Sequence, residues 1–151
     1  MLKETLKTLY RRDIEKLKLE IESYQDENNL WLVEKNVSNS AGNLCLHLIG
    51  NLNHFIGALI GKSGYIRNRD LEFSNKQVLR SELLQKIDET LIVVENALET
   101  LSNEQFEEDY PLIVFEDKMT TGYFLVHLAT HLTYHLGQIN YHRRLLDAEK
   151  S

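Results

Sequence analysis

Four segments of the chain place apolar side chains at three- and four-residue steps, which is the spacing of an amphipathic α-helix. Only one proline, Pro111, is present, so long helices are possible on either side of it. Four such helices predict an all-α fold, specifically an antiparallel four-helix bundle that forms a single domain over residues 1–151. The predicted helices span residues 2–24, 41–61, 75–101 and 121–146.

The predicted helix starts follow side chains that can hydrogen-bond the free amides of a first helical turn. Ser38 or Ser40 is expected to cap the second helix, and Thr120 the fourth. Ser74 and Gln77 form a capping box that would start the third helix. The connections are expected to be a polar loop with an apolar clip (25–40), an exposed crossover (62–73), and a turn followed by an extended piece (102–119).

The second predicted helix is apolar on more than one side. Leu44, Leu48 and Leu52 form one row, whereas Leu46 and Ile49 point elsewhere. A helix that is apolar on several sides is buried on several sides. In a small bundle the simplest additional partner is a second copy of the chain, which predicts a homodimer.

Composition narrows the classes of partner and compartment. The formal net charge is -6, with 23 acidic against 17 basic side chains, which argues against nucleic acid as the main partner. No apolar run is long enough to predict a membrane span, and the first residues are too charged for a signal peptide. The single cysteine, Cys45, excludes an internal disulfide and is expected to be a core residue. We therefore expect a cytoplasmic protein that acts on a small molecule.

The distribution of the six histidines is the most informative feature for function. His131 and His135 are four residues apart, so a helix places both imidazoles on one face, where they can bind one metal ion. In the second helix, His47 and His54 are seven residues apart and share a stripe with Asn51. A polar stripe in a core needs partners. A metal ion bound by one histidine of the second helix and two of the fourth would provide them.

A structural interpretation of these histidines is the alternative. A helical histidine is often only a hydrogen-bonded or half-exposed side chain, and this interpretation is favoured for His142, next to Arg143. Other metal and catalytic motifs are absent from the sequence. There is no Glu-x-x-His of the di-iron bundles, no His-Glu-x-x-His, no Gly-x-Ser-x-Gly, no glycine-rich phosphate loop and no Cys-x-x-Cys.

Two segments resemble the signature of the DinB/YfiT-like superfamily. Residues 127–139, HLATHLTYHLGQI, resemble its last bundle helix, and residues 40–52, SAGNLCLHLIGNL, resemble its first metal-binding helix. The helical pattern matches over essentially the whole chain. The resemblance implies an up-down-down-up order of helices, a homodimer, and a divalent metal ion held by His47, His131 and His135.

The resemblance also implies a class of activity. Characterised relatives include thiol transferases and isomerases of thiol adducts, which predicts a metal-dependent S-transferase with a low-molecular-weight thiol as co-substrate, or a hydrolase. Zinc, nickel, iron and manganese are candidate metals. A non-catalytic interaction module or metal-binding stress protein is the alternative. Supporting or pocket roles are expected for His54, His127, Asn51 and Gln138, and a direct role in the chemistry is considered for Tyr110, Glu116 and Asp117.

Overall fold

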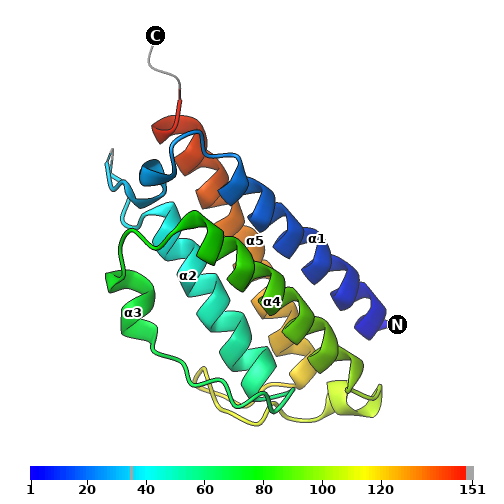
Figure 1. The fold of residues 1–151 in the computed structure, drawn as a ribbon. Coiled ribbons are helices and arrows are strands. Elements are labelled where there is room, and N and C mark those ends of the chain that lie inside the picture. The colour runs from blue at the N-terminus through cyan, green and yellow to red at the C-terminus, as the bar shows by residue number, and fades with distance from the viewer. Residues whose placement is uncertain (35, 149–151) are drawn as a thin grey trace.

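The computed structural model describes residues 1–34 and 36–148, and every regular element in this part of the chain is helical. The prediction of an all-α fold is confirmed. None of these helices is both long and apolar enough to cross a bilayer. The elements, shown in Figure 1, are α1 (Leu2–Glu22), η1 (Glu27–Trp31), α2 (Ala41–Leu52), η2 (Asn53–Ala58), α3 (Arg69–Ser74), α4 (Arg80–Glu99), η3 (Glu104–Glu107) and α5 (Thr121–Leu146).

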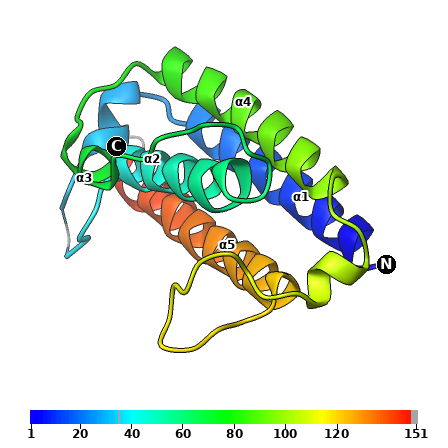
Figure 2. The ribbon, with the colours of Figure 1, turned by 90° about the horizontal axis from the view of Figure 1, so that it is seen from below.

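The four long helices lie side by side, and each packs against two of the others. α1 contacts α4 and α5, and α2 contacts the same two helices from the other side of the core. Figure 2 shows α2 between α4 and α5. α1 and α5 run in one direction, whereas α2 and α4 run in the opposite direction (Figure 1). Apolar side chains at helical spacing fill the space between the helices, among them Leu6, Ile14, Leu48, Ile87 and Leu132.

The extra apolar rows of α2 are covered by the chain itself. All 12 residues of this helix are buried, including Leu46 and Ile49. α3 and η1 pack on α2 in addition to α4 and α5, and they cover the sides that the long helices leave free. The rows therefore give no reason to expect a second copy of the chain, and the predicted homodimer rests on the resemblance alone.

Most of the predicted crossover over residues 62–73 is exposed, as expected, but its end folds into a helix that buries one side chain. The end of this segment forms α3, whose N-cap Asn68 accepts a hydrogen bond from the amide of Leu71. α3 packs against α2 and buries Glu72, which is only 6% exposed. A helix of six residues is too short to show a helical period, which is why the sequence pattern did not reveal it.

The predicted capping box at the start of the third long helix is wrong. Ser74 is the last residue of α3, and Gln77 has a left-handed φ of 58°. α4 begins only at Arg80, where the N-cap residue Leu79 makes no side-chain hydrogen bond and the carboxylate of Glu27 accepts from the backbone amide of Arg80 at 3.0 Å. The side-chain amide of Asn43 donates through Nδ2 to the backbone carbonyls of Glu72 and Asn75, at 2.9 and 2.8 Å. These two hydrogen bonds tie the end of α3 to α2.

The other predicted helix starts are confirmed. The hydroxyl of Ser40 accepts from the amide of Asn43, and that of Thr120 from the amide of Tyr123, both at 3.1 Å. At its other end, α2 does not continue as a regular helix to residue 61. The helix widens into the π turn η2, whose five-residue step is seen in the 3.2 Å hydrogen bond from the backbone amide of Leu59 to the carbonyl of His54.

Candidate metal centre

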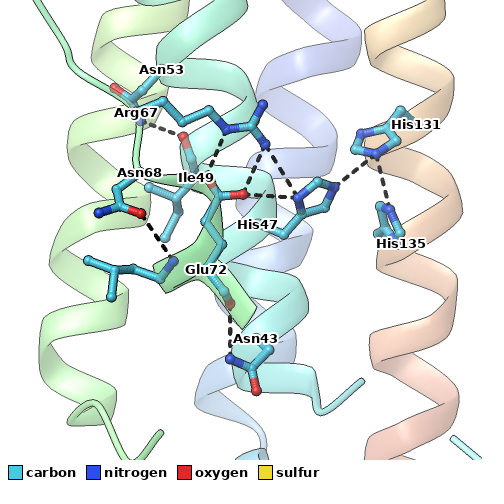
Figure 3. A network of polar contacts seen from close by, with 10 residues as sticks. Asn43, His47, Ile49, Asn53, Arg67, Asn68, Glu72, His131 and His135 are labelled. Atoms are coloured by element: carbon cyan, nitrogen blue, oxygen red, sulfur yellow. Dashed lines mark hydrogen bonds and ion pairs between the residues drawn. The ribbon is translucent and has the colours of Figure 1, made fainter. Parts of the chain in front are cut away.

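Three histidines converge where α2 and α5 pack together (Figure 3). Nε2 of His131 lies 3.2 Å from Nε2 of His47 and 3.1 Å from Nε2 of His135. One ligand nitrogen of each ring lies within 4.8 Å of the other two. Two of these candidate ligands come from adjacent turns of α5, and the third comes from α2, which runs antiparallel to it. These are the three residues that the resemblance assigns as ligands.

The carboxylate of Glu72 sets the tautomer of His47. Its Oε1 lies 3.1 Å from Nδ1 of His47, and because an ionised carboxylate can only accept, Nδ1 carries the hydrogen. Nε2 of His47 therefore presents a lone pair towards His131. Metal-ligating histidines usually donate their other N–H to a carboxylate or carbonyl in this way.

Glu72 is itself held by a bidentate pair with Arg67. Nε of Arg67 donates to Oε2 at 2.8 Å, and Nη2 donates to Oε1 at 2.9 Å. Burial by itself raises the pKa of the Glu72 carboxyl, but the hydrogen bonds from His47 and Arg67 outweigh burial and lower this pKa overall. A glycine makes room for the group, because a Cβ on Gly50 would lie 1.9 Å from Oε2 of Glu72. The carboxylate thus occupies space beside α2 that a side chain would fill.

Gln138 orients His135 in a similar way. Its Oε1 lies 2.7 Å from Nδ1 of His135, so Nδ1–H donates to the amide oxygen and Nε2 keeps a lone pair. Burial lowers the pKa of His135, although the hydrogen bond to Gln138 opposes this. Both rings that flank His131 therefore point a lone pair at the centre of the group.

His131 lies between these two rings and is the most perturbed of the three. Burial, followed by the neighbouring His135 and His47, lowers the pKa of His131 to about 4. The ring is neutral at pH 7, which is the form that binds a metal ion. Its Nδ1 is buried and has no hydrogen-bond partner within the described residues. The polar neighbours of this ring are therefore the two other histidines, at its Nε2.

The donor set fits a divalent transition metal ion. Two nitrogens that each lie about 2.0–2.1 Å from a tetrahedral zinc ion are roughly 3.3 Å apart, close to the observed spacings of 3.1 and 3.2 Å. Three neutral imidazoles suit zinc, nickel or iron. Three protein ligands also leave one coordination position open. Catalytic zinc sites have such an open position, whereas structural zinc sites have four protein ligands.

A cavity of about 300 Å³ opens beside the three histidines. His47 and His131 form part of its wall, together with Asn51 one turn further along α2. His127, one turn before His131 on α5, also lines it, and its ring stacks on that of Phe124 at 5.9 Å between centroids. The structure thus places Asn51 and His127 at the cavity, and Gln138 behind His135.

His54 lies outside the group of three converging histidines. Its ring packs edge-on against Phe55, with 4.7 Å between centroids. The expected alignment of His47 with His54 assumes a regular α-helix, but the π turn starts at Asn53 and changes the angular step between residues. Burial lowers the pKa of His54, and Arg67 contributes to this.

The acids and the phenol of the loop before α5 do not line the cavity. Glu116 and Asp117 are exposed side chains of that loop. The hydroxyl of Tyr110 is buried and donates to the carbonyl of Phe55, within the π turn. Burial also raises the pKa of Tyr110. Tyr110 therefore fixes the backbone of a cavity wall and does not present a free acid.

His142 and Cys45 take the structural roles expected of them. Nε2–H of His142 donates to the carbonyl of Leu32 at 2.9 Å, and Nδ1 accepts from the hydroxyl of Tyr24 at 2.7 Å. Cys45 is completely buried, which raises the pKa of its thiol to about 12. Neither group reaches the three converging histidines.

Sequence reasoning missed the pair Glu72 and Arg67. Both lie in a segment without apolar periodicity that was expected to be an exposed crossover. The available signal was indirect, since a metal-ligating His47 would need an acceptor for its second ring nitrogen. Nothing in the sequence spacing links residue 47 to residue 72.

A family model described as "Protein of unknown function (DUF1572)" matches residues 2–151. The chain belongs to the DUF1572 family. Comparison of this DUF1572 chain with curated proteins and with solved structures gives no match.

Proposed function

We propose that this DUF1572 chain is a DinB/YfiT-like antiparallel four-helix bundle, with helices in up-down-down-up order, that binds one divalent metal ion through His47, His131 and His135. Its proposed activity is metal-dependent transfer of a low-molecular-weight thiol to an electrophile, or hydrolysis, in the adjoining cavity. Zinc, nickel, iron and manganese are the candidate metals. The observation that carries the proposal is the convergence of three Nε2 atoms whose two flanking rings have their Nδ1 hydrogens already engaged.

The rings of the proposed ligands are preorganised for binding a cation. Glu72 and Gln138 hold His47 and His135 in the tautomer that a metal ion needs, so binding costs little reorganisation. The lowered pKa of His131 removes competition by protons at neutral pH. Lone pairs that face one another at 3.1 and 3.2 Å are unfavourable unless a proton or a cation lies between them.

The cavity residues indicate what the chain would contribute to a reaction. A divalent metal ion with an open position lowers the pKa of a bound water or thiol and so supplies a nucleophile near neutral pH. Phe55, Phe115 and Phe124 form an apolar part of the cavity wall. His127 lines the same cavity without belonging to the ligand set, so its imidazole is the candidate group to accept or return a proton.

A non-catalytic metal-binding protein is the second candidate. It is favoured by the composition of the cavity wall, which includes no aspartate or glutamate within the described residues. Without a carboxylate among the described residues of the wall, the general base has to be His127. The alternative predicts full metal occupancy without turnover.

Metal analysis of protein purified without a histidine tag tests the site. We expect one divalent ion per chain and loss of this ion in His131→Ala. His54→Ala is the matched control, since it removes a histidine of the neighbouring π turn that lies outside the converging group. Retention of stoichiometric metal by His131→Ala would contradict the ligand assignment. Thiol transfer to chloro-aromatic or epoxide electrophiles then separates an enzyme from a metal-binding protein.

The resemblance also favours a homodimer. Sedimentation at micromolar concentration measures this directly. A monomer under these conditions would remove the dimer from the proposal and leave the metal site unaffected, because all three proposed ligands come from one chain.

A further inference from the structure

The cavity beside the three histidines is cationic in a chain that is acidic overall. The formal net charge of the protein is -6. Yet the wall of this cavity includes Arg67 and Arg69, and within the described residues it includes no acidic side chain. A bound divalent ion with three neutral ligands would add further positive charge that the cavity wall does not compensate. The charge at this place therefore differs in sign from that of the whole molecule.

The two arginines are in different situations. Arg67 is half-buried, and its guanidinium is neutralised by the bidentate pair with Glu72. Arg69 is exposed, and its guanidinium makes no hydrogen bond or ion pair with any residue of the described chain. Its contact is with the face of the Phe73 ring, 5.5 Å from the centroid. Arg69 therefore lines the cavity with five N–H donors that no acceptor of the described chain occupies.

The neighbouring amide of Asn51 also lacks a partner. Asn51 is 6% exposed and lines the cavity, and its Oδ1 is buried without a hydrogen bond. An unpaired buried polar atom costs free energy, so native proteins usually satisfy it with protein, water or a ligand. Because Oδ1 can only accept, it requires a hydrogen-bond donor such as water, and the charged group of an anion does not satisfy it.

Aromatic rings form the remaining part of the wall. Phe55 and Phe124 pack edge to face at 5.2 Å between centroids, and Phe115 lies 6.2 Å from Phe124. These rings provide an apolar surface opposite the polar groups. Ligand pockets commonly combine such a surface with a few placed polar groups.

We propose that this cavity binds a small organic anion, with its charged group against Arg69 and its apolar part against the phenylalanine wall. Arg69 is then a specificity-determining residue of the proposed site. This inference rests on the proposed function in so far as two of the three proposed ligands, His47 and His131, line the cavity. It adds the chemical class of the substrate and a residue that recognises it.

Isothermal titration calorimetry with three probes tests the inference. Phenylacetate carries both the ring and the charge, phenylacetamide is its neutral analogue, and acetate lacks the ring. Each is titrated into zinc-loaded and metal-free protein. We expect phenylacetate to bind at least about tenfold more tightly than either other probe, because a guanidinium–carboxylate pair is a charge-assisted hydrogen bond. This preference should persist in the metal-free protein.

Substitution of the arginine separates recognition by Arg69 from direct ligation of the metal. Arg69→Met should abolish the preference for phenylacetate over phenylacetamide, and Arg69→Lys should retain part of it. Arg144→Met is the matched control, since Arg144 carries the same charge near the end of α5, stacks over Tyr141 and does not line the cavity. It should leave the preference unchanged.

Several outcomes would overturn the inference. One is the absence of phenylacetate binding at millimolar concentration, and another is equal affinity for phenylacetate and phenylacetamide. A third is a preference for phenylacetate over phenylacetamide that survives in Arg69→Met. A preference that disappears with the metal would show that the carboxylate only ligates the ion. Failure of the proposed function looks different: the protein would hold no metal but still show an Arg69-dependent preference for the anion.

Discussion

Replacement of Gly50 by alanine tests how the metal centre is supported. A Cβ at this position would lie 1.9 Å from Oε2 and 2.6 Å from Cδ of Glu72. Real Cβ atoms do not approach other heavy atoms below 3.0 Å, so the carboxylate has to move by about 1.1 Å. Such a movement is incompatible with the present contacts to His47 at 3.1 Å and to Arg67 at 2.8 and 2.9 Å.

The expected magnitude follows from the role of Glu72. Loss of the group that orients a metal-ligating histidine typically lowers metal affinity 10- to 100-fold, or about 1.4–2.8 kcal/mol. The helix itself should gain about 0.5–1 kcal/mol, because alanine restricts the unfolded chain more than glycine does. The lost contacts of the buried Glu72 carboxylate oppose this gain in the metal-free fold. The measured effect of Gly50→Ala on metal affinity, taken with that on stability, therefore reports the orienting role of Glu72.

Competition with a chromophoric chelator measures the affinity, and urea unfolding measures the stability. Gly137→Ala is the matched control, because Gly137 also lies within a helix but its added Cβ would meet no atom within 4 Å. It should gain helix stability without loss of metal affinity. Glu72→Gln should reproduce the loss, and the double variant Gly50→Ala/Glu72→Gln should show no further loss. Wild-type affinity in Gly50→Ala, or additive losses in the double variant, would refute the reasoning.

Three further predictions concern the surroundings of the site. Tyr110→Phe leaves the carbonyl of Phe55 without its hydrogen-bond donor and should destabilise the protein by about 1–3 kcal/mol in urea unfolding, whereas the exposed control Tyr123→Phe should have little effect. Burial lowers the pKa of His142, so below the unfolded pKa of about 6.5 the unfolded state binds more protons, and the metal-free protein should lose stability as pH falls from 7 to 5. His142→Gln should show a shallower loss, and an identical pH profile would contradict this assignment. Cys45 should react with a thiol reagent only after unfolding in urea, because its pKa is raised to about 12 and it is fully buried; stoichiometric labelling of the folded protein would exclude this.

The sequence by itself determined the helical class. It also predicted two of the three helices that carry the candidate site, α2 and α5, but not α3. Apolar side chains at helical spacing place the long helices, because a helix in water has to bury one face. The four-residue step between His131 and His135 places both rings on one face of α5 whatever else the chain does. The hydroxyl caps at Ser40 and Thr120 are equally local, and the structure shows both.

Only the tertiary structure decided which groups meet at that site. The contact of His47 with Glu72 joins residues 25 positions apart through the packing of α3 on α2, and Glu72 in turn pairs with Arg67. The side of the helix on which the residues after Leu52 lie depends on a π turn that a seven-residue spacing cannot reveal. Spacing along a helix fixes angles only within that helix, whereas contacts between elements depend on how side chains of both partners pack. The orientation of the candidate ligands is therefore a property of the packed molecule.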